Sequence, residues 1–229
     1  MAKLTYLGHS AFMLEADGHT VLIDPFLTHN PKASHAAENV HPETILVTHA
    51  HNDHVGDTIA IAKRTGAKVI TTFELGEWLE SQGVENAVPA NHGGTVKFAG
   101  GTAKLVPAWH TSSYSLPEGG TTAIGFPAGF VVRMGGSCIY FAGDTALFGD
   151  MRLIGEEGLD AAVIPIGDHY TMGPEDGVRA ADMLGPKVVI PCHYNTFPPI
   201  AQDEAAFAAK VEAKGIRCAP LSPGESVEV

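Results

Sequence analysis

Short apolar runs alternate with Gly- and Pro-rich segments along most of this 229-residue chain. Runs of this length, bounded by turn-forming residues, are typical of β-strands. The pair Gly135-Gly136 predicts a hairpin turn between two of them. The predicted strands are Leu4–Leu7, Ala11–Glu15, Thr20–Ile23, Ile45–Val47, Lys68–Thr71, Ala103–Pro107, Thr122–Phe126, Phe130–Met134, Cys138–Ala142, Ala161–Pro165, Val188–Pro191 and Arg217–Ala219.

Helical periodicity occurs at four places in the chain. Pro174 suits the first position of one helix, and Gly66 and Gly215 suit the residues just after two others. The predicted helices are Thr58–Thr65, Leu75–Ser81, Pro174–Leu184 and Glu204–Lys214. Strands and helices are mixed in both halves of the chain, which indicates an α/β (or α+β) fold.

The two halves also resemble one another. The predicted strands Thr20–Ile23 and Cys138–Ala142 each lead to an aspartate, Asp24 and Asp144. In each half a later strand leads to a histidine, His49 in the first half and His169 in the second. We therefore expect a single domain, residues 1–229, made of two similar halves that meet near residues 105–120 and collect ligands at a shared edge.

Composition narrows the function classes. The formal net charge of −12 makes binding of a nucleic-acid polymer unfavourable, so a small-molecule substrate is the expected partner. No apolar stretch approaches the roughly 20 residues that cross a bilayer, and no signal peptide is visible, so we expect no membrane insertion and a cytoplasmic location. The three cysteines lack CxxC spacing and are expected to be reduced thiols.

The most informative polar cluster is Thr48-His49-Ala50-His51-Asn52-Asp53-His54, which follows the apolar run Ile45–Val47. Neutral imidazoles and carboxylates are the usual ligands of a catalytic divalent metal. His49 and His51 would lie on one side of an extended segment. A polar loop with fortuitous histidines is the alternative, and the rarity of the pattern argues against it.

Three further residues follow predicted strands and could complete a metal site: His110, Asp144 and His193. A lone histidine after a strand is more often structural, and Asp144 could instead cap a helix. However, the cluster at His49–His54 needs further ligands, and a carboxylate can bridge two metals. Cys192, beside His193, is interpreted as a packed thiol.

Three more residues are candidates for roles beside the metal ligands. His169 could bind metal, stabilise a substrate oxyanion or hold Asp168. His9 could lie near the site or be structural, and Asp24 is expected to orient a ligand imidazole. The remaining histidines, His19, His29, His35, His41 and His92, are expected to be solvated.

The ordered set H-x-H-x-D-H, His, Asp, His resembles the signature of the metallo-β-lactamase superfamily. Further motifs resemble a branch of small metal-dependent hydrolases, which is similar to the ascorbate-6-phosphate lactonases and, more distantly, to N-acylphosphatidylethanolamine phospholipases D. These motifs are Gly8-His9-Ser10-Ala11-Phe12, Ile23-Asp24-Pro25, Thr171-Met172-Gly173 and His193-Tyr194-Asn195-Thr196-Phe197.

The resemblance implies a four-layer αβ/βα sandwich, with two mixed β-sheets packed together and helices outside. It also implies two divalent metal ions, Zn²⁺ by default, with Mn²⁺, Ni²⁺ or Fe²⁺ as alternatives. One ion would take His49, His51 and His110. The other would take Asp53, His54 and His193, and Asp144 would bridge the two.

The implied activity is that of a metal-dependent hydrolase, which uses a metal-activated hydroxide on a small ester, lactone or phosphodiester. Asp53 would orient the nucleophile or carry its proton, and His169 or Tyr194 would stabilise an oxyanion. The alternatives are a nuclease or cyclic-nucleotide phosphodiesterase of the same fold and a non-catalytic metal-binding protein. A homo-oligomer is compatible with the sequence.

Overall fold

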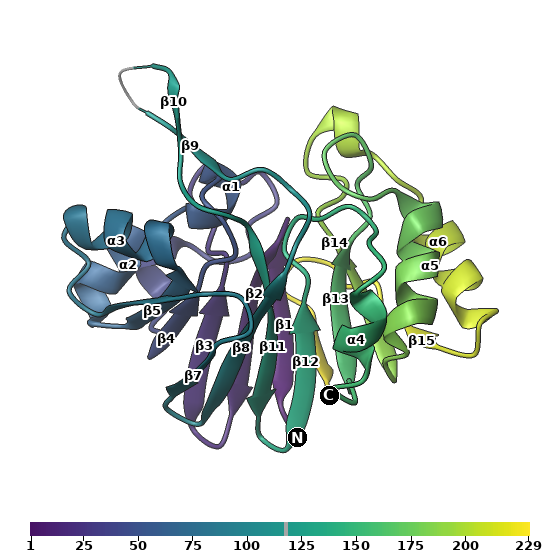
Figure 1. Ribbon diagram of the computed structural model, residues 1–229. Helices are drawn as coiled ribbons and strands as arrows, with labels where there is room; N and C mark the ends of the chain where they lie inside the picture. Colours follow the sequence, from purple (N-terminus) through teal and green to yellow (C-terminus); the bar gives the residue numbers. More distant parts are fainter. Residues whose placement is uncertain (117–118) are drawn as a thin grey trace.

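The computed structural model describes residues 1–116 and 119–229. Two seven-stranded sheets pack face to face, and helices cover the outer face of each sheet (Figure 1). The predicted α/β class and the four-layer αβ/βα sandwich are confirmed.

The first sheet comes mainly from the N-terminal part of the chain. Its strands from β16 to β3 are antiparallel, and those from β3 to β6 are parallel. In spatial order the strands are β16 (Ser226–Glu228), β1 (Lys3–Gly8), β2 (Ala11–Ala16), β3 (His19–Ile23), β4 (Thr44–Leu46), β5 (Lys68–Thr72) and β6 (Ala87–Ala90).

The second sheet repeats this plan, since its strands are antiparallel from β7 to β12 and parallel from β12 to β15. The predicted hairpin turn at Gly135-Gly136 joins β11 to β12, and both glycines have positive φ. In spatial order the strands are β15 (Arg217–Cys218), β14 (Val188–Cys192), β13 (Ala161–Pro165), β12 (Ser137–Phe141), β11 (Ala128–Met134), β8 (Gly101–Pro107) and β7 (Thr95–Phe98).

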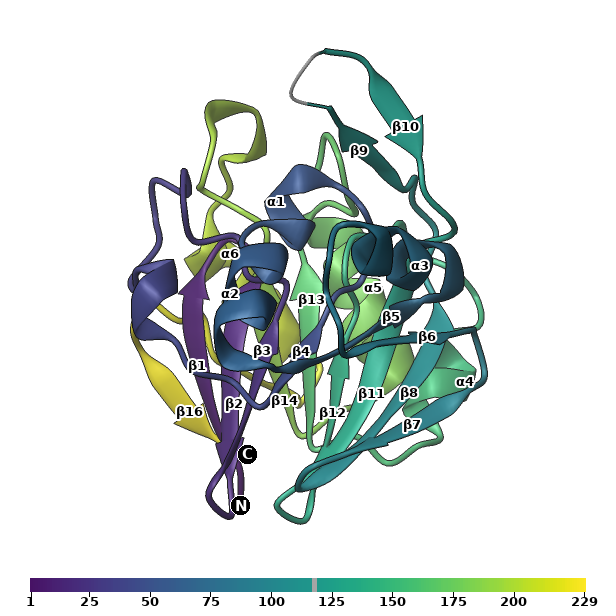
Figure 2. The same cartoon turned by 90° about the vertical axis from the view of Figure 1, so that its left-hand side faces the viewer.

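The outer layers contain the helices (Figure 2). The apolar faces of α2 and α3 pack on the first sheet, and those of α4, α5 and α6 pack on the second. The sequence missed α1 and α4 because a single turn is too short to show helical periodicity. The helices are α1 (Asn52–Val55), α2 (Thr58–Thr65), α3 (Phe73–Ser81), α4 (Met151–Gly155), α5 (Pro174–Leu184) and α6 (Glu204–Glu212), with 3₁₀ turns at Ala37–Asn39 and Pro198–Ile200.

The main core lies between the two sheets. It includes Phe12, Leu46, Phe130 and Phe141, all at most 2% exposed. Ile45, the neighbour of Leu46 on β4, points to the opposite face and packs with the helical layer. The central parallel strands are therefore buried on both faces, and for this reason their sequences are continuous apolar runs.

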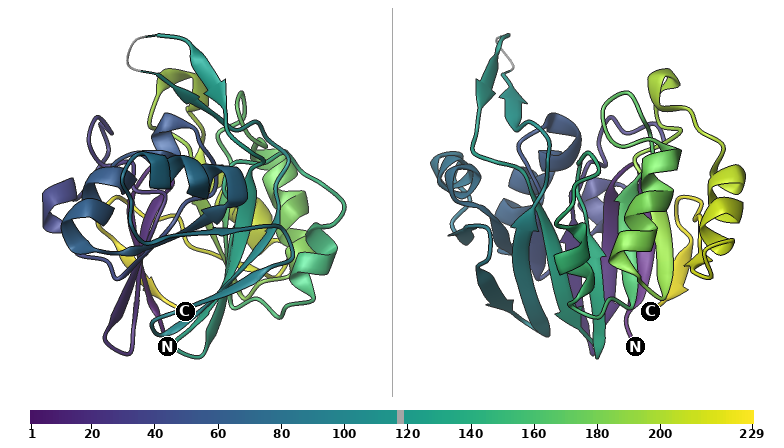
Figure 3. Two further views of the ribbon diagram at one scale, coloured as in Figure 1. Left: turned by 60° about the vertical axis from the view of Figure 1, so that its left-hand side comes forward. Right: turned by 45° about the vertical axis from the view of Figure 1, so that its right-hand side comes forward.

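Weak patterns at the sheet edges hid several strands. The strands β6, β7 and β16 were not predicted. The chain crosses from the first sheet to the second between Ala90 and Thr95, which is earlier than the expected region 105–120. That region also contains residues 117–118, which lie outside the described residues. The predicted strand Thr122–Phe126 is wrong in extent. It is the short strand β10 (Thr121–Ala123), which pairs with β9 (Ser113–Ser115) in a hairpin that projects from the molecule (Figure 3).

Candidate metal centre

The predicted ligands follow strands that end at one edge of the sandwich, and this edge lies opposite the chain termini (Figure 1). β3, β4, β8, β12, β13 and β14 all have their C-terminal ends at this edge. His49 and His51 follow β4, and Asp53 and His54 lie on α1. The two sheets therefore bring together residues that are far apart in the sequence.

Two clusters of potential ligand atoms form there. His49, His51, His110 and Asp144 make up one cluster, and His9, Asp53, His54 and His193 make up the other; within each cluster one ligand atom per residue lies within 4.8 Å of the others.

Asp144 belongs to one cluster but faces both. Its Oδ2 lies 3.5 Å from His110 Nε2 and 3.1 Å from His193 Nε2. Its Oδ1 lies 3.3 Å from His54 Nε2. Asp144 therefore faces ligand atoms of both clusters, and its role as a bridge between two metal ions stays a prediction.

The hydrogen bonds of Asp24 fix the orientation of two imidazoles. Thr48 donates to this carboxylate from its backbone nitrogen (2.8 Å) and from its hydroxyl (2.7 Å), and His54 donates from Nδ1 (2.8 Å). Because the Thr48 hydroxyl proton is already used, His49 Nδ1 donates to Thr48 Oγ1, at 3.0 Å. His49 Nε2 and His54 Nε2 therefore face the centre of the site.

The geometry fits divalent cations. His49 Nε2 lies 3.0 Å from His51 Nδ1, and Thr111 Oγ1 lies 3.4 Å from His51 Nε2. Within the described part of the chain, His54 Nε2 and Asp144 Oδ1 are buried without a hydrogen-bond partner. These donor sets suit Zn²⁺, Mn²⁺, Fe²⁺ or Ni²⁺.

The site's electrostatics favour metal binding. Burial lowers the pKa of His49 well below its usual value and also lowers the pKa values of His51 and His110, so these ligands are neutral. Burial opposes ionisation of Asp144, but His193 and His54 outweigh it and hold the pKa of this carboxyl well below its usual range. Burial likewise favours neutral His54, yet Asp144 and Asp24 raise its pKa. The carboxylates therefore attract positive charge into the site.

His9 lies closer to the site than the sequence could establish. Its Nε2 donates to Asp53 Oδ2 at 3.1 Å, and the Thr196 hydroxyl donates to its Nδ1 at 2.9 Å. Burial lowers the pKa of His9 to about 4, so the ring is neutral. This pairing makes His9 a residue that orients Asp53. The sequence signal was Gly8, whose φ of 113° and lack of Cβ fit a tight turn beside the Lys32 carbonyl.

Two residues with a suggested oxyanion role lie outside the two clusters. Tyr194 is buried and lines a separate cavity of about 190 Å³ with Tyr6 and Glu204, so the role suggested for it has no geometric support. His169 is exposed in the loop after β13, where its ring packs edge-on against Tyr170 at 4.4 Å. That loop lies between the strand ends that carry Asp144 and His193, because β13 lies between β12 and β14.

Backbone strain is concentrated at this edge. His9, Asp24 and His193 all have positive φ, between 42° and 61°, although none is glycine. Asp168 and His169 share this conformation. Strained residues of this kind often occur at functional sites, where the surrounding structure holds them in place.

Comparisons with known proteins support this fold. The family model of the beta-lactamase superfamily domain matches residues 3–193. A UPF0173 metal-dependent hydrolase of Thermus thermophilus is 55% identical over 226 residues, which cover 98% of each chain. A UPF0173 metal-dependent hydrolase of Methanopyrus kandleri is 46% identical over 229 residues, 99% of each chain.

A solved structure extends the comparison. Igni18, a metallo hydrolase from the archaeon Ignicoccus hospitalis, superposes with a TM-score of 0.89 at 40% sequence identity, over 99% of this chain and 97% of that one. The chain therefore belongs to the beta-lactamase superfamily. Within it, the chain is a metal-dependent hydrolase, as its relatives are. No helix in residues 1–116 or 119–229 is both long and apolar enough to cross a membrane.

Proposed function

We propose that this protein binds two divalent metal ions and hydrolyses a small ester, lactone or phosphodiester. The observation that carries the proposal is the position of Asp144, whose two oxygens face ligand nitrogens of both clusters at 3.1–3.5 Å. His49, His51 and His110 would hold one ion, and Asp53, His54 and His193 would hold the other. Zn²⁺ is the first choice for this donor set, and Mn²⁺ is the second.

Divalent ions bound here would supply Lewis acidity and would make hydroxide available from water near neutral pH. In ester hydrolysis, the hydroxyl of water adds to the acyl carbon, the carbon–oxygen bond breaks, and the leaving oxygen takes a proton. Asp53 is suited to move that proton, because His9 fixes its Oδ2 and its side chain is 34% exposed. His169, on the exposed loop, is the proposed donor to the developing oxyanion.

The first test combines metal analysis with a substrate panel. Protein purified without chelators should contain about two divalent ions per chain and should hydrolyse at least one of p-nitrophenyl butyrate, a γ-lactone and bis-p-nitrophenyl phosphate. His49→Ala should lose metal and at least ~100-fold in kcat/KM, since it removes a buried ligand.

His19→Ala is the matched control. His19 pairs with Glu43 at 2.7 Å near the start of β3, at the opposite end of that strand from the site, so its loss should leave metal content and turnover unchanged. The proposal is wrong if fully loaded protein turns over none of the three substrates, or if His49→Ala matches the wild type.

A further inference from the structure

An aromatic wall borders the second cluster of the metal centre. The rings of Phe26 and Phe197 each lie 5.7 Å from the ring of His9, and both meet it edge-on. Phe26 follows β3 and Phe197 follows β14, so two separate loops supply this wall. Phe197 remains 37% exposed, although it packs beside a fully buried histidine.

Two further exposed aromatic residues lie on neighbouring loops, one beside His110 and one after β13. Trp109, immediately before His110, is 68% exposed, and Tyr170 is 56% exposed. Thr145, the residue after Asp144, joins their loops. Its hydroxyl accepts from the Trp109 backbone nitrogen at 2.9 Å, and its carbonyl accepts from that of Met172 at 3.0 Å. Aromatic residues therefore occur on loops around both clusters.

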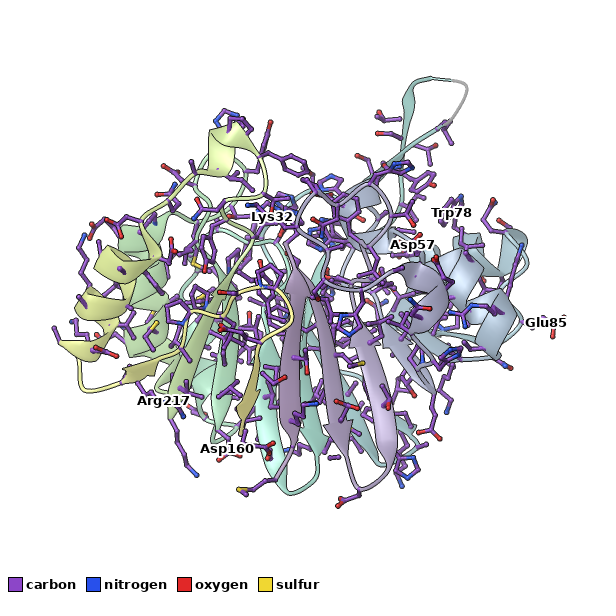
Figure 4. The ribbon with its side chains drawn as sticks, turned by 180° about the vertical axis from the view of Figure 1, so that it is seen from behind. Lys32, Asp57, Trp78, Glu85, Asp160 and Arg217 are labelled. Carbon is purple, nitrogen blue, oxygen red and sulfur yellow. The ribbon has the colours of Figure 1, made fainter. Side chains whose placement is uncertain are left out.

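Cationic residues are nearly absent from the same loops. The segments that follow β3, β4, β8, β12, β13 and β14 are residues 24–36, 47–57, 108–127, 142–150, 166–173 and 193–203. Of the 14 lysines and arginines in the sequence, Lys32 alone falls within them. Lys32 lines the separate cavity beside Tyr194 and Glu204. Figure 4 shows it toward the same end of the molecule as Asp57, with Asp160 and Arg217 toward the other end.

This distribution bears on substrate charge. Sites that bind phosphate groups or extra carboxylates use Arg or Lys, whose charge-assisted hydrogen bonds offset the cost of desolvating the anion. Here the metal ions would be the main positive charges. They would be needed for the reacting group and would not be free to bind a second anionic group of the substrate. An anionic group elsewhere on the substrate would meet aromatic rings and carboxylates.

We propose that the substrate is an electrically neutral carboxylic ester or lactone, whose alkyl or aryl group packs against Phe26 and Phe197. This inference rests on the proposed function and narrows its substrate class, since it disfavours phosphodiesters and phosphorylated lactones. Burial against the wall should raise kcat/KM about four-fold for each methylene that becomes covered.

The test uses metal-loaded protein and the p-nitrophenyl esters of acetate, butyrate and hexanoate. The wild type should show rising kcat/KM along this series and should cleave p-nitrophenyl hemisuccinate and bis-p-nitrophenyl phosphate at least ~10-fold less efficiently than the butyrate. In Phe197→Ala the increase with chain length should be at least halved, mainly through a higher KM. Phe73→Ala is the matched control, because Phe73 is 46% exposed on α3, outside these loops.

A binding measurement separates recognition from turnover. Calorimetric titration with 2-octanone, a neutral ketone that cannot be hydrolysed, should give at least five-fold weaker binding to Phe197→Ala than to wild type or Phe73→Ala. Equal binding to all three, or preferred cleavage of the hemisuccinate or the phosphodiester, would overturn the inference and leave the hydrolase proposal intact. If no substrate is cleaved, the hydrolase proposal fails while the ketone titration still decides whether the wall binds apolar groups.

Discussion

Single residues in this site act largely by fixing the orientation of others. Asp24 is not in either cluster, yet it accepts hydrogen bonds from Thr48 and His54 and, through the Thr48 hydroxyl, sets the orientation of His49. His9 likewise fixes the orientation of Asp53, because its Nε2 donates to Asp53 Oδ2. Partners of this kind raise metal affinity because they hold the ligand nitrogens and oxygens in the binding geometry before the metal arrives.

Asp24→Asn should weaken metal binding by about 10–100-fold. The substituted amide keeps the side-chain shape but places an NH₂ group against the Thr48 hydroxyl or His54 Nδ1, both of which are donors. A competition titration against a fluorescent chelator measures the change. Glu43→Gln is the control, since Glu43 makes a similar contact to His19 at the surface. Unchanged affinity in Asp24→Asn would contradict the orienting role.

At the scale of elements, the site depends on the loops that follow the strands. The loop after β12 shows the constraint most clearly. Gly143 has φ of 62°, and a Cβ there would lie 2.8 Å from the Thr48 Cβ. This close approach seats the Asp144 loop against the His49 loop of the other sheet.

Gly143→Ala should lower the free energy of unfolding by more than Gly136→Ala does. Both glycines have positive φ, so each substitution carries a conformational cost of about 1 kcal/mol, but a Cβ at Gly136 meets no atom within 4 Å. Gly143→Ala should also weaken metal binding. Urea denaturation and metal titration of the two variants measure these effects, and equal behaviour would show that the contact with Thr48 is unimportant.

At the opposite ends of the same strands, Asp160 joins β12 to the start of β13. It accepts from the Cys138 backbone nitrogen at 2.8 Å and pairs with Lys187 at 2.7 Å. The Lys187 interaction is the largest cause that holds the pKa of Asp160 below its usual 3.8, with the hydrogen bond from Cys138 adding to it.

Because the folded state lowers this pKa, Asp160 stabilises the protein above about pH 4 and loses that effect as the pH falls through the folded-state pKa. Asp160→Asn should therefore reduce stability at pH 7 by at most about 1 kcal/mol, since solvent screens the pair with the exposed Lys187, and the difference should shrink as the pH falls below about 4. Urea midpoints at several pH values measure it. Asp182→Asn, which removes only an exposed pair with Lys214, is the control, and a difference that does not shrink as the pH is lowered would contradict this account.

On the scale of the whole molecule, the candidate metal ligands come from both sheets. The first sheet and its loops supply His49, His51, Asp53 and His54, and the second supplies His110, Asp144 and His193. Together with the shared core, the bound metal should hold both halves in one cooperative unit. The expected cytoplasmic location and possible homo-oligomer stay predictions from the sequence.

Removal of metal should lower the thermal stability of the whole protein. At a metal concentration 100-fold above Kd, one site stabilises the folded state by about 2.7 kcal/mol, which corresponds to a Tm shift of roughly 5–10 °C for a chain of this size. Differential scanning calorimetry with and without chelator measures this shift. His49→Ala should respond much less, and equal transitions for wild type in both conditions would contradict metal binding to the folded state.

The sequence determined the types of chemistry and most of the buried framework. Continuous apolar runs identified the central strands, because burial on both faces leaves no polar positions. Imidazoles and carboxylates after those runs identified the candidate ligands. The short edge strands and single-turn helices escaped detection, because their local patterns are too weak to separate them from loops.

Only the tertiary structure decided which groups meet. Strand pairing placed Asp144 between two clusters, brought His9 from the first turn of the chain onto Asp53, and directed Tyr194 into a separate cavity. It also placed Phe26 and Phe197, which belong to loops far apart in the sequence, against the ring of His9. Such contacts depend on sheet order and on backbone conformations with positive φ, and neither is encoded in the residues immediately around each position.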